Sequence, residues 1–297
     1  MIKFSKYLWL YFIISGIVLI PGIYTLARHG LKQSIDFAGG TLLELRVNKS
    51  LSESEIRDVG QRHNLEIGSV AKSGDASYIL RMKSESQDKL VALTTDIASR
   101  SGAIVSIVRS ETVGPVLGKE LLSKATVAAI LAISSILLYV AYAFKNVRFG
   151  VAAIIALIHD LLVVLGMFAL FGRWWNVEVD TLFVTAFLTT MSFSVHDTIV
   201  VFDRIREYLK RDRTRKFEEI CDIALTETMN RSLTNSLTII FMLLALILMG
   251  GETIKWFVVA LLVGTVSGTY SSPFVATPVL MLWHNWEQKK KNIKREA

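Results

Sequence analysis

Residues 149–171 read FGVAAIIALIHDLLVVLGMFALF, an apolar stretch interrupted only by His159 and Asp160. An α-helix rises about 1.5 Å per residue, so about 20 such residues cross the roughly 30 Å hydrocarbon core of a bilayer. The stretch is therefore long enough to span a membrane. A charged side chain at the bilayer centre costs about 2.5–3.5 kcal/mol on insertion scales, so the carboxylate in its middle requires a partner or a function.

Five further segments of the chain have a similar length and apolar character. The six predicted spans are 8–26, 125–144, 149–171, 182–202, 233–249 and 256–283. The 297 residues are 52% hydrophobic with a mean hydropathy of +0.45, which is more apolar than a soluble domain of this size. The sequence thus predicts an α-helical polytopic membrane protein with six transmembrane helices. The last is long enough to bend at Pro273 and Pro278.

The first span has an alternative interpretation as a secretory signal peptide, because Lys3 and Lys6 precede its apolar run. That run exceeds the roughly 7 to 15 apolar residues of a signal peptide, and no small-x-small cleavage site follows it. We therefore expect the segment to remain as a membrane anchor.

Lysine and arginine residues are distributed unevenly among the short connections. They gather in 3–6, 145–148, 204–216 and 289–295, whereas the connections 172–178 and 250–255 offer only Arg173 and Lys255. Because positively charged loops stay in the cytoplasm, we expect both termini to be cytoplasmic, together with a basic loop at about 203–230 and a basic tail at 286–297. Topology and contact with anionic lipids then explain the net charge of +7, without nucleic acid as a partner. Cys221 is the lone cysteine and lies in this loop, so disulfides play no part.

The polar stretch 27–123 is predicted to be a folded extracytoplasmic domain. Alternating apolar residues predict strands at 41–47, 67–71, 77–82 and 104–108, with a turn around 73–75. The residues typical of helix ends are Ser52 with Glu55, Ser84 with Gln87, and Gly102. The resulting order, βαββαβ, is that of an inserted α+β ferredoxin-like domain. The chain is thereby divided into 1–26, 27–123, 124–285 and 286–297.

Ionisable residues inside two other spans are the strongest functional signal. Asp197 lies in the fourth span with His196 beside it, and Arg231 opens the fifth. At helical spacing two polar stripes form that could face each other, namely Thr190, Ser194 and Asp197 on one helix and Arg231, Thr234, Asn235 and Thr238 on the next. Desolvation and a nearby guanidinium act on a carboxylate in opposite directions, so Asp197 with Arg231 could load and release a proton. The predicted ion pathway consists of Asp197, Arg231, His196, Ser194, Thr234 and Asn235.

A secondary intramembrane polar site is formed by His159 and Asp160, and its role stays open between packing and function. The sequence places no cation at the depth of Asp160, which favours a hydrogen-bonded packing group.

Neither His-Asp pair has the His-Glu-x-x-His spacing of a metalloprotease. Residues 114–120 lack the spacing and the hydroxyl of a phosphate loop. We therefore expect no catalytic residues, no metal and no cofactor.

Six short motifs follow one another along the chain. They are residues 36–40 (DFAGG), 113–115 (VGP), 156–160 (ALIHD), 197–207 (DTIVVFDRIRE), 231–236 (RSLTNS) and 268–272 (GTYSS). Together they resemble the SecF subunits of the bacterial Sec translocase. These subunits belong to the SecD/SecF family, which is related to resistance-nodulation-division (RND) transporters. The resemblance covers nearly the whole chain.

This resemblance implies an RND-like half-bundle in the bacterial cytoplasmic (inner) membrane. It implies SecD as a partner that supplies a second bundle, the SecYEG channel upstream, and a translocating preprotein as substrate. Export would be promoted by the proton-motive force, with Asp197 and Arg231 in the ion pathway. The expected coupling ion is H⁺, and Na⁺ is the alternative.

Two positions depart from the family pattern. His196 stands where the family usually has Asn, so either this imidazole joins the proton relay or it replaces the hydrogen bonds of the amide. Ser34 stands where the family often has Gly.

Two other functions are compatible with charge inside the membrane. An RND-type exporter of small molecules or lipids would use the same proton chemistry, but such proteins generally have twelve spans and larger outer domains. A structural scaffold would need Asp197 for stability rather than for transport.

Overall fold

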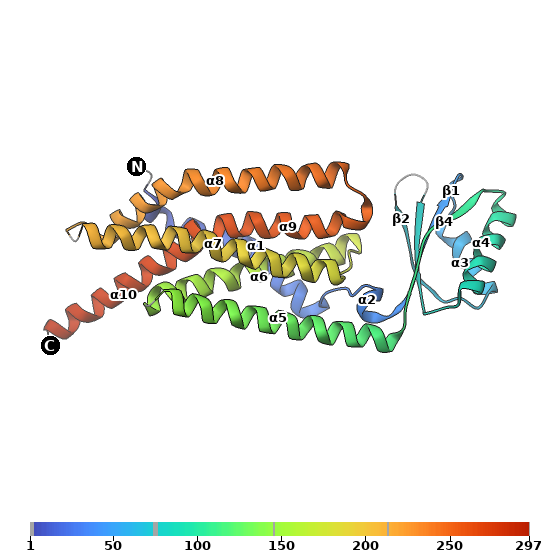
Figure 1. The fold of residues 1–297 in the computed structure, drawn as a ribbon, viewed down its shortest axis with the longest axis horizontal. Helices are drawn as coiled ribbons and strands as arrows, with labels where there is room; N and C mark the ends of the chain where they lie inside the picture. The colour runs from blue at the N-terminus through green and yellow to red at the C-terminus, as the bar shows by residue number, and fades with distance from the viewer. Residues whose placement is uncertain (1–2, 74–76, 145, 213, 297) are drawn as a thin grey trace. The chain divides into compact units, whose positions relative to one another are not determined.

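The computed structural model describes residues 3–73, 77–144, 146–212 and 214–296. It divides into two compact units, one formed by Met1–Lys32 with Ala129–Ala297 and the other by Gln33–Ala128 (Figure 1). The second unit differs from the predicted domain 27–123 by a few residues at each end. The reason is that the first helix continues to His29 and the helix that follows the domain begins inside it, at Pro115.

Six helical spans in the described residues are long and apolar enough to cross a membrane, which confirms the predicted number. A short helix η1 (Phe4–Tyr7) leads into the first of them. The helices are α1 (Leu8–His29), α5 (Pro115–Ala143), α6 (Val147–Trp175), α7 (Thr181–Arg211), α8 (Phe217–Met249), and α9 (Glu252–Ser271) with α10 (Thr277–Glu296). The chain is an integral membrane protein.

The predicted extent of the basic loop at 203–230 is wrong, because α7 continues to Arg211 and α8 already begins at Phe217. Hydropathy marks where lipid contact ends, whereas the helices continue through their charged turns. Arg204 pairs with Glu207 on its own helix and with Glu227 on α8, which stabilises those turns. Arg231 therefore lies near the middle of α8 and does not open it. The predicted tail 286–297 is likewise helical as far as Glu296.

Small residues bring the central helices into close contact. A Cβ atom added at Gly22 of α1 would lie 2.9 Å from the Gly166 Cα atom of α6. On α9, a Cβ atom at Gly264 would lie 2.2 Å from Thr190 Cγ2, and one at Gly268 would lie 3.1 Å from Ser194 Cα. Gly264 and Gly268, which are four residues apart, therefore form a small-residue packing face of α9 against α7.

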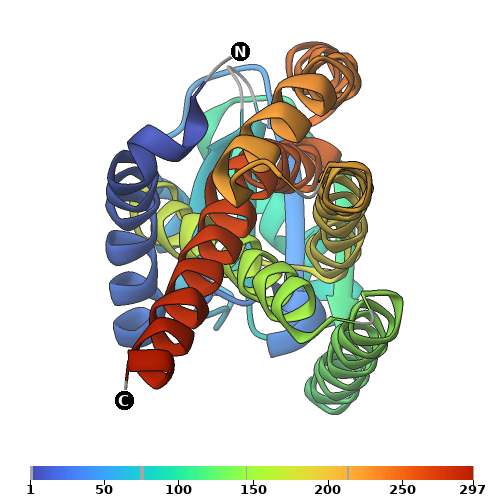
Figure 2. The same cartoon turned by 90° about the vertical axis from the view of Figure 1, so that its left-hand side faces the viewer.

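The last span bends, as its two prolines predicted. A π-helix, η2 (Ser272–Ala276), separates α9 from α10 and contains Pro273. Proline has no N–H to donate and its ring crowds the preceding turn, so the regular ladder is interrupted there. In Figure 1, α10 leaves the direction of α9, and Figure 2 shows α10 (red) crossing in front of the other membrane helices.

The second unit is a four-stranded antiparallel sheet with two longer helices. Its elements are α2 (Ile35–Ala38), β1 (Gly40–Val47), α3 (Glu53–Arg62), β2 (Ile67–Ser73), β3 (Ser77–Met82), α4 (Gln87–Ser101) and β4 (Val105–Val113). The strand order is β2-β3-β1-β4, and every neighbouring pair is antiparallel. This confirms the βαββαβ ferredoxin-like fold. Of the predicted turn around 73–75, residues 74 and 75 lie outside the described residues.

One face of this sheet is the core of the domain. Leu43, Leu45 and Val47 alternate along β1 and are at most 1% exposed, as predicted. They pack with residues of both helices, including Leu90 and Leu93 of α4. The structure differs from the prediction at two boundaries. The residue that precedes α4 is Ser86 rather than Ser84, and β4 continues to Val113 because it pairs with the whole of β1.

Two predicted motifs meet at the end of this domain where α5 starts. Gly39 has a φ of 76°, and a Cβ atom there would lie 2.8 Å from Pro115 Cα. A Cβ atom at Gly118 would lie 2.9 Å from the Phe37 carbonyl oxygen. The DFAGG and VGP motifs therefore form one backbone-to-backbone contact that side chains would separate.

Ser52 and Glu55 form the predicted capping box of α3. The Ser52 N–H donates to Glu55 Oε2 at 2.8 Å, and the Glu55 N–H donates to Ser52 Oγ at 3.2 Å. The backbone N–H and then the hydroxyl of Ser52 lower the pKa of the exposed Glu55 carboxyl. Because this pKa is lower in the folded protein, the contact stabilises α3 fully above the unfolded pKa and is lost as the pH falls through the folded one.

We expect Ser52→Ala to open the first turns of α3. Loss of an N-cap costs about 1 kcal/mol, so amide hydrogen exchange in α3 should accelerate roughly fivefold near neutral pH. The difference from the unaltered protein should shrink once the pH is low enough to protonate Glu55. Equal exchange rates in both proteins at neutral pH would contradict this role of the cap.

Candidate functional site

A small cavity among α7, α8 and α9 contains part of the predicted ion pathway. Its volume is about 20 Å³, which is room for roughly one water molecule. Its lining residues are Phe193, His196, Asp197, Asn235, Ser236, Ile239, Thr265, Gly268 and Thr269. Helical spacing placed Asp197 and Asn235 on facing stripes, with His196 beside Asp197, and these three side chains line one cavity.

Asp197 is the half-buried carboxylate of this cavity. The groups close enough to influence it electrostatically are His196, Arg231 and Ser232. Arg231 is an exposed side chain, so the positive charge of its guanidinium lies on the outward side of α8. The arrangement can hold a proton or a small cation at Asp197 under the field of an adjacent guanidinium.

A second and larger cavity contains Arg231. It has a volume of about 510 Å³ and is lined by Val200, Asp203, Arg204, Glu207, Glu227, Thr228 and Arg231. Arg204 donates to both Glu207 and Glu227 at 2.5 Å, and Tyr208 donates to Glu227 at 2.5 Å. Arg231 therefore lines a cavity rich in carboxylates and also influences Asp197 electrostatically.

Two predicted pathway residues lie elsewhere. Thr234 is exposed on α8 and is outside the lining of either cavity. Ser194 is 1% exposed and donates to Asp160 Oδ2 at 2.5 Å, so its contact is with the second polar site and not with the cavity at Asp197. Along a helix that is packed on several sides, residues three or four apart share a stripe but need not share a partner.

Asp160 accepts hydrogen bonds from three helices. Ser194 of α7 and Ser271 of α9 donate to Oδ2 at 2.5 and 2.6 Å. Ser267 of α9 donates to Oδ1 at 2.5 Å, and His159 Nδ1 lies 3.0 Å from the same oxygen. The Asp160 residue is only 5% exposed. A carboxylate has about four lone-pair sites, so these contacts satisfy it fully. The imidazole beside the carboxylate is that of His159, the other residue of the predicted secondary site.

His159 continues this network towards α1. Its Nε2 atom lies 3.1 Å from the Ser15 hydroxyl, which in turn lies 3.3 Å from the Tyr270 hydroxyl of α9. Tyr270 donates to the Tyr11 carbonyl oxygen at 2.7 Å. His159 and Ser15 are each 7% exposed, so the contact between them is buried in the bundle.

Comparison with known proteins gives this arrangement a family. Residues 94–286 match the family described as protein export membrane protein SecD/SecF, C-terminal, and residues 24–50 match the SecD/SecF GG motif. The chain belongs to the SecD/SecF family. This places it among protein export membrane proteins and not among enzymes.

Relatives named protein translocase subunit SecF align with nearly the whole chain. The protein of Thermobaculum terrenum is 42% identical over 96% of this chain and 95% of its own length. That of Anaerolinea thermophila is 38% identical over 94% and 93%. The crystal structure of SecDF from Thermus thermophilus is similar with a TM-score of 0.85 and 30% identity. The match covers 96% of this chain but 39% of SecDF, so the chain spans about two fifths of that protein.

The SecD/SecF GG motif includes Gly39 and Gly40, whose φ angles are 76° and 135°. A Cβ atom at Gly40 would lie 2.7 Å from the Met82 carbonyl oxygen, and Gly39 is pressed against Pro115. Both glycines are therefore required by backbone conformation and by close approach.

Sequence reasoning missed several polar partners. Thr269 donates to Ser236 at 2.7 Å beside Asp197, and Ser15, Ser267 and Ser271 surround the His159–Asp160 pair. A signal existed for Ser267 and Ser271, which are four residues apart and so share one face of α9. Ser15 gave none, because a single serine in a membrane helix usually bonds its own backbone.

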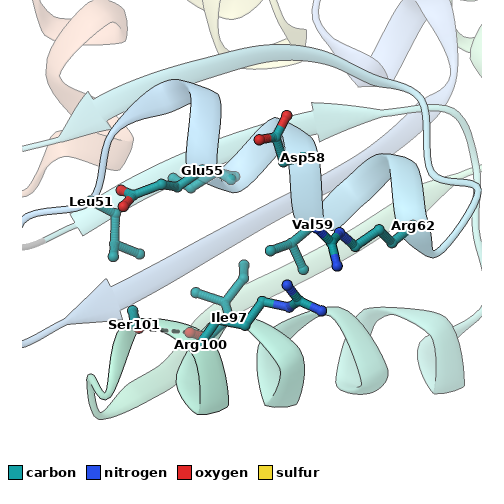
Figure 3. Close-up of a pocket in the computed structure, with 9 residues that line it drawn as sticks. Leu51, Glu55, Asp58, Val59, Arg62, Ile97, Arg100 and Ser101 are labelled. Atoms are coloured by element: carbon teal, nitrogen blue, oxygen red, sulfur yellow. Dashed lines mark hydrogen bonds between the residues drawn. The ribbon is translucent and has the colours of Figure 1, made fainter.

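A surface groove in the other unit lies apart from these residues. It has a volume of about 210 Å³ between α3 and α4, with an apolar floor that includes Val59 and Ile97 (Figure 3). Glu55 lies towards one end of the groove, whereas Arg62 and Arg100 lie together at the other. The charges of both signs on its rim favour no single class of ligand.

Proposed function

We propose that this chain is the SecF subunit of a Sec protein-export machinery, which works with SecD and uses the proton-motive force to promote preprotein translocation across the cytoplasmic membrane. Family membership and the similarity to SecDF support the general assignment. The single observation that carries the proton coupling is the small polar cavity that contains Asp197, with Arg231 acting on it from α8. A carboxylate in that position costs too much to be retained for packing alone.

The exposed polar side chains of α8 support a SecD partner. Arg231, Thr234 and Asn235 are exposed although they lie within a candidate membrane span. Polar groups facing hydrocarbon are unfavourable, so a second helical bundle is expected to cover them. The chain spans 39% of SecDF, which leaves room for such a bundle in a complete assembly.

We further propose that the membrane is the bacterial cytoplasmic (inner) membrane, with both termini in the cytoplasm and the ferredoxin-like domain outside. The uneven distribution of lysine and arginine supports this orientation. The basic segments would then lie against anionic lipids. SecYEG and the translocating preprotein are the remaining proposed partners, with H⁺ as the coupling ion and Na⁺ as the alternative.

The test is reconstitution of the chain with a SecD partner and SecYEG in lipid vesicles, with preprotein translocation as the readout. We expect the SecD-containing complex to increase translocation under a proton gradient, and a protonophore to remove this increase. An increase that persists without any proton gradient but requires a sodium gradient would assign Na⁺. No increase under either gradient would refute the proposed function.

A further inference from the structure

The His159–Asp160 pair is a buried titratable group that the proposed function leaves unused. Its hydrogen bonds define which atoms carry hydrogen, because the hydroxyl of a serine or tyrosine has one hydrogen to donate. The Tyr270 hydroxyl uses its hydrogen on the Tyr11 carbonyl oxygen at 2.7 Å. Its oxygen can therefore only accept from Ser15.

The imidazole of His159 is oriented by the carboxylate. Asp160 Oδ1 lies 3.0 Å from Nδ1, and both carboxylate oxygens already accept hydrogen bonds from serine hydroxyls. An anionic Asp160 satisfies all four of these contacts, so Nδ1 carries a hydrogen and donates it. The state of Nε2 then depends on Ser15.

The Ser15 hydroxyl has two neighbours and one hydrogen. If Ser15 donates to Nε2 at 3.1 Å, then His159 is neutral. If Ser15 donates to the Tyr270 oxygen at 3.3 Å, its own oxygen faces Nε2 and accepts a hydrogen from it, so His159 is an imidazolium paired with Asp160. Each arrangement is internally consistent, and they differ by one proton and one hydroxyl rotation.

We propose that His159 and Asp160 form a second proton-binding site, in which the proton resides on His159 Nε2 and the Ser15 hydroxyl of α1 turns to match its presence. Binding creates an ion pair of 3.0 Å between adjacent residues at 8% and 6% side-chain exposure. The added positive charge is balanced by the carboxylate, so no net charge is left buried.

The neighbouring helices bring few other titratable groups to the pair. Tyr270 of α9 stacks on His159 with ring centroids 6.1 Å apart, and α7 presents the hydroxyl of Ser194. On α10, His284 contacts Arg148 in the first turn of α6, which at about 1.5 Å per residue is roughly 17 Å along the helix from His159. His196 and Asp197 of α7 line the other cavity.

The site is connected to the break in the last span. Ser271 ends α9 and donates to Asp160, and the next residue, Ser272, begins the π-helix and lies 2.9 Å from the Thr198 hydroxyl. Thr198 follows Asp197 directly. Single π-helical turns are frequent at functional sites. Protonation of His159 therefore acts on the same segment of α7 as the ion pathway.

The experiment is solid-state NMR of the full chain in lipid vesicles with ¹⁵N-labelled histidine. The five histidines give separate signals, and His159→Gln identifies the relevant one by its loss. Between about pH 5 and pH 9 we expect His159 Nε2 to change from protonated to bare, while Nδ1 keeps its hydrogen. A single protonation state across this range would overturn the proposal.

Two variants and one control test the roles assigned to Asp160 and Ser15. Asp160→Asn should lose the imidazolium signal over the whole range. Ser15→Ala removes the acceptor of Nε2–H, so the same occupancy should require about tenfold more protons. Gly16→Ala is the matched control on α1, because its Cβ atom would meet only Ile20 at 3.8 Å. Asp160→Asn or Ser15→Ala titrating like the control would refute the site. The readout is independent of export, so it is not affected by the outcome for Asp197.

Discussion

We expect Asp197→Asn and Arg231→Met each to abolish the proton-dependent increase in preprotein translocation. Asp197→Asn removes the titratable carboxylate from the small cavity and replaces it with an amide side chain of the same size. Arg231→Met removes the guanidinium that acts on Asp197 and keeps a long side chain in the large cavity. Each substitution removes one charge from the membrane-spanning segments and adds none, so both variants should insert and pair with SecD.

The measurement is translocation into vesicles with and without a proton gradient, at equal amounts of assembled complex. Asp212→Asn and Arg215→Met are matched controls, since these residues form a 2.8 Å ion pair in the short connection between α7 and α8. The controls should keep the full increase. If the Asp197 and Arg231 variants also keep it, the ion pathway does not pass through them. Loss of assembly in these variants alone would instead support a scaffold.

Much of the fold follows from apolar length and strand alternation. The six spans and the sheet of the outer domain were predictable, because lipid contact and a one-sided core impose strong periodic patterns. The ends of α7 and α8 were not predictable from hydropathy. Their charged turns remain helical through ion pairs such as Arg204–Glu227, which join residues on two helices.

The candidate site was also only partly predictable, because its contacts join residues on different helices. Helical spacing indicated that Asp197 and Asn235 face each other because they lie on consecutive helices, α7 and α8, and both line the small cavity. The contact of Ser194 with Asp160 was not predictable, because it depends on how α7 packs against α6, and α9 brings Ser267 and Ser271 to the same carboxylate. Spacing within a helix cannot reveal which of several neighbours faces a given residue.

The second large effect is expected at the contact between α1 and α6. A Cβ atom at Gly166 would lie 2.8 Å from the Gly22 Cα atom, closer than real Cβ atoms come to other heavy atoms. The obstacle is backbone, so it cannot turn aside as a flexible side chain would. Gly166→Ala must therefore push the two helices apart, at a cost of about 1 to 3 kcal/mol by analogy with overpacked cores.

The matched control is Gly150→Ala on the same helix, where an added Cβ atom would meet nothing within 4 Å. Alanine has the higher helix propensity, so this control should be as stable as the unaltered protein or slightly more stable. Thermal unfolding in detergent measures the difference between the two variants. An equal midpoint for both would show that α1 and α6 do not depend on this close approach.

Gly166→Ala should also change the titration of His159, which lies two turns earlier on α6 and reaches Ser15 of α1 at 3.1 Å. Separation of the helices lengthens this contact, so the signal of His159 should resemble that of Ser15→Ala. The effect distinguishes two explanations of lower stability. A general loosening of the bundle would also disturb His284, which stacks on Phe217 at a centroid distance of 4.1 Å, whereas a local separation of α1 from α6 leaves that signal unchanged.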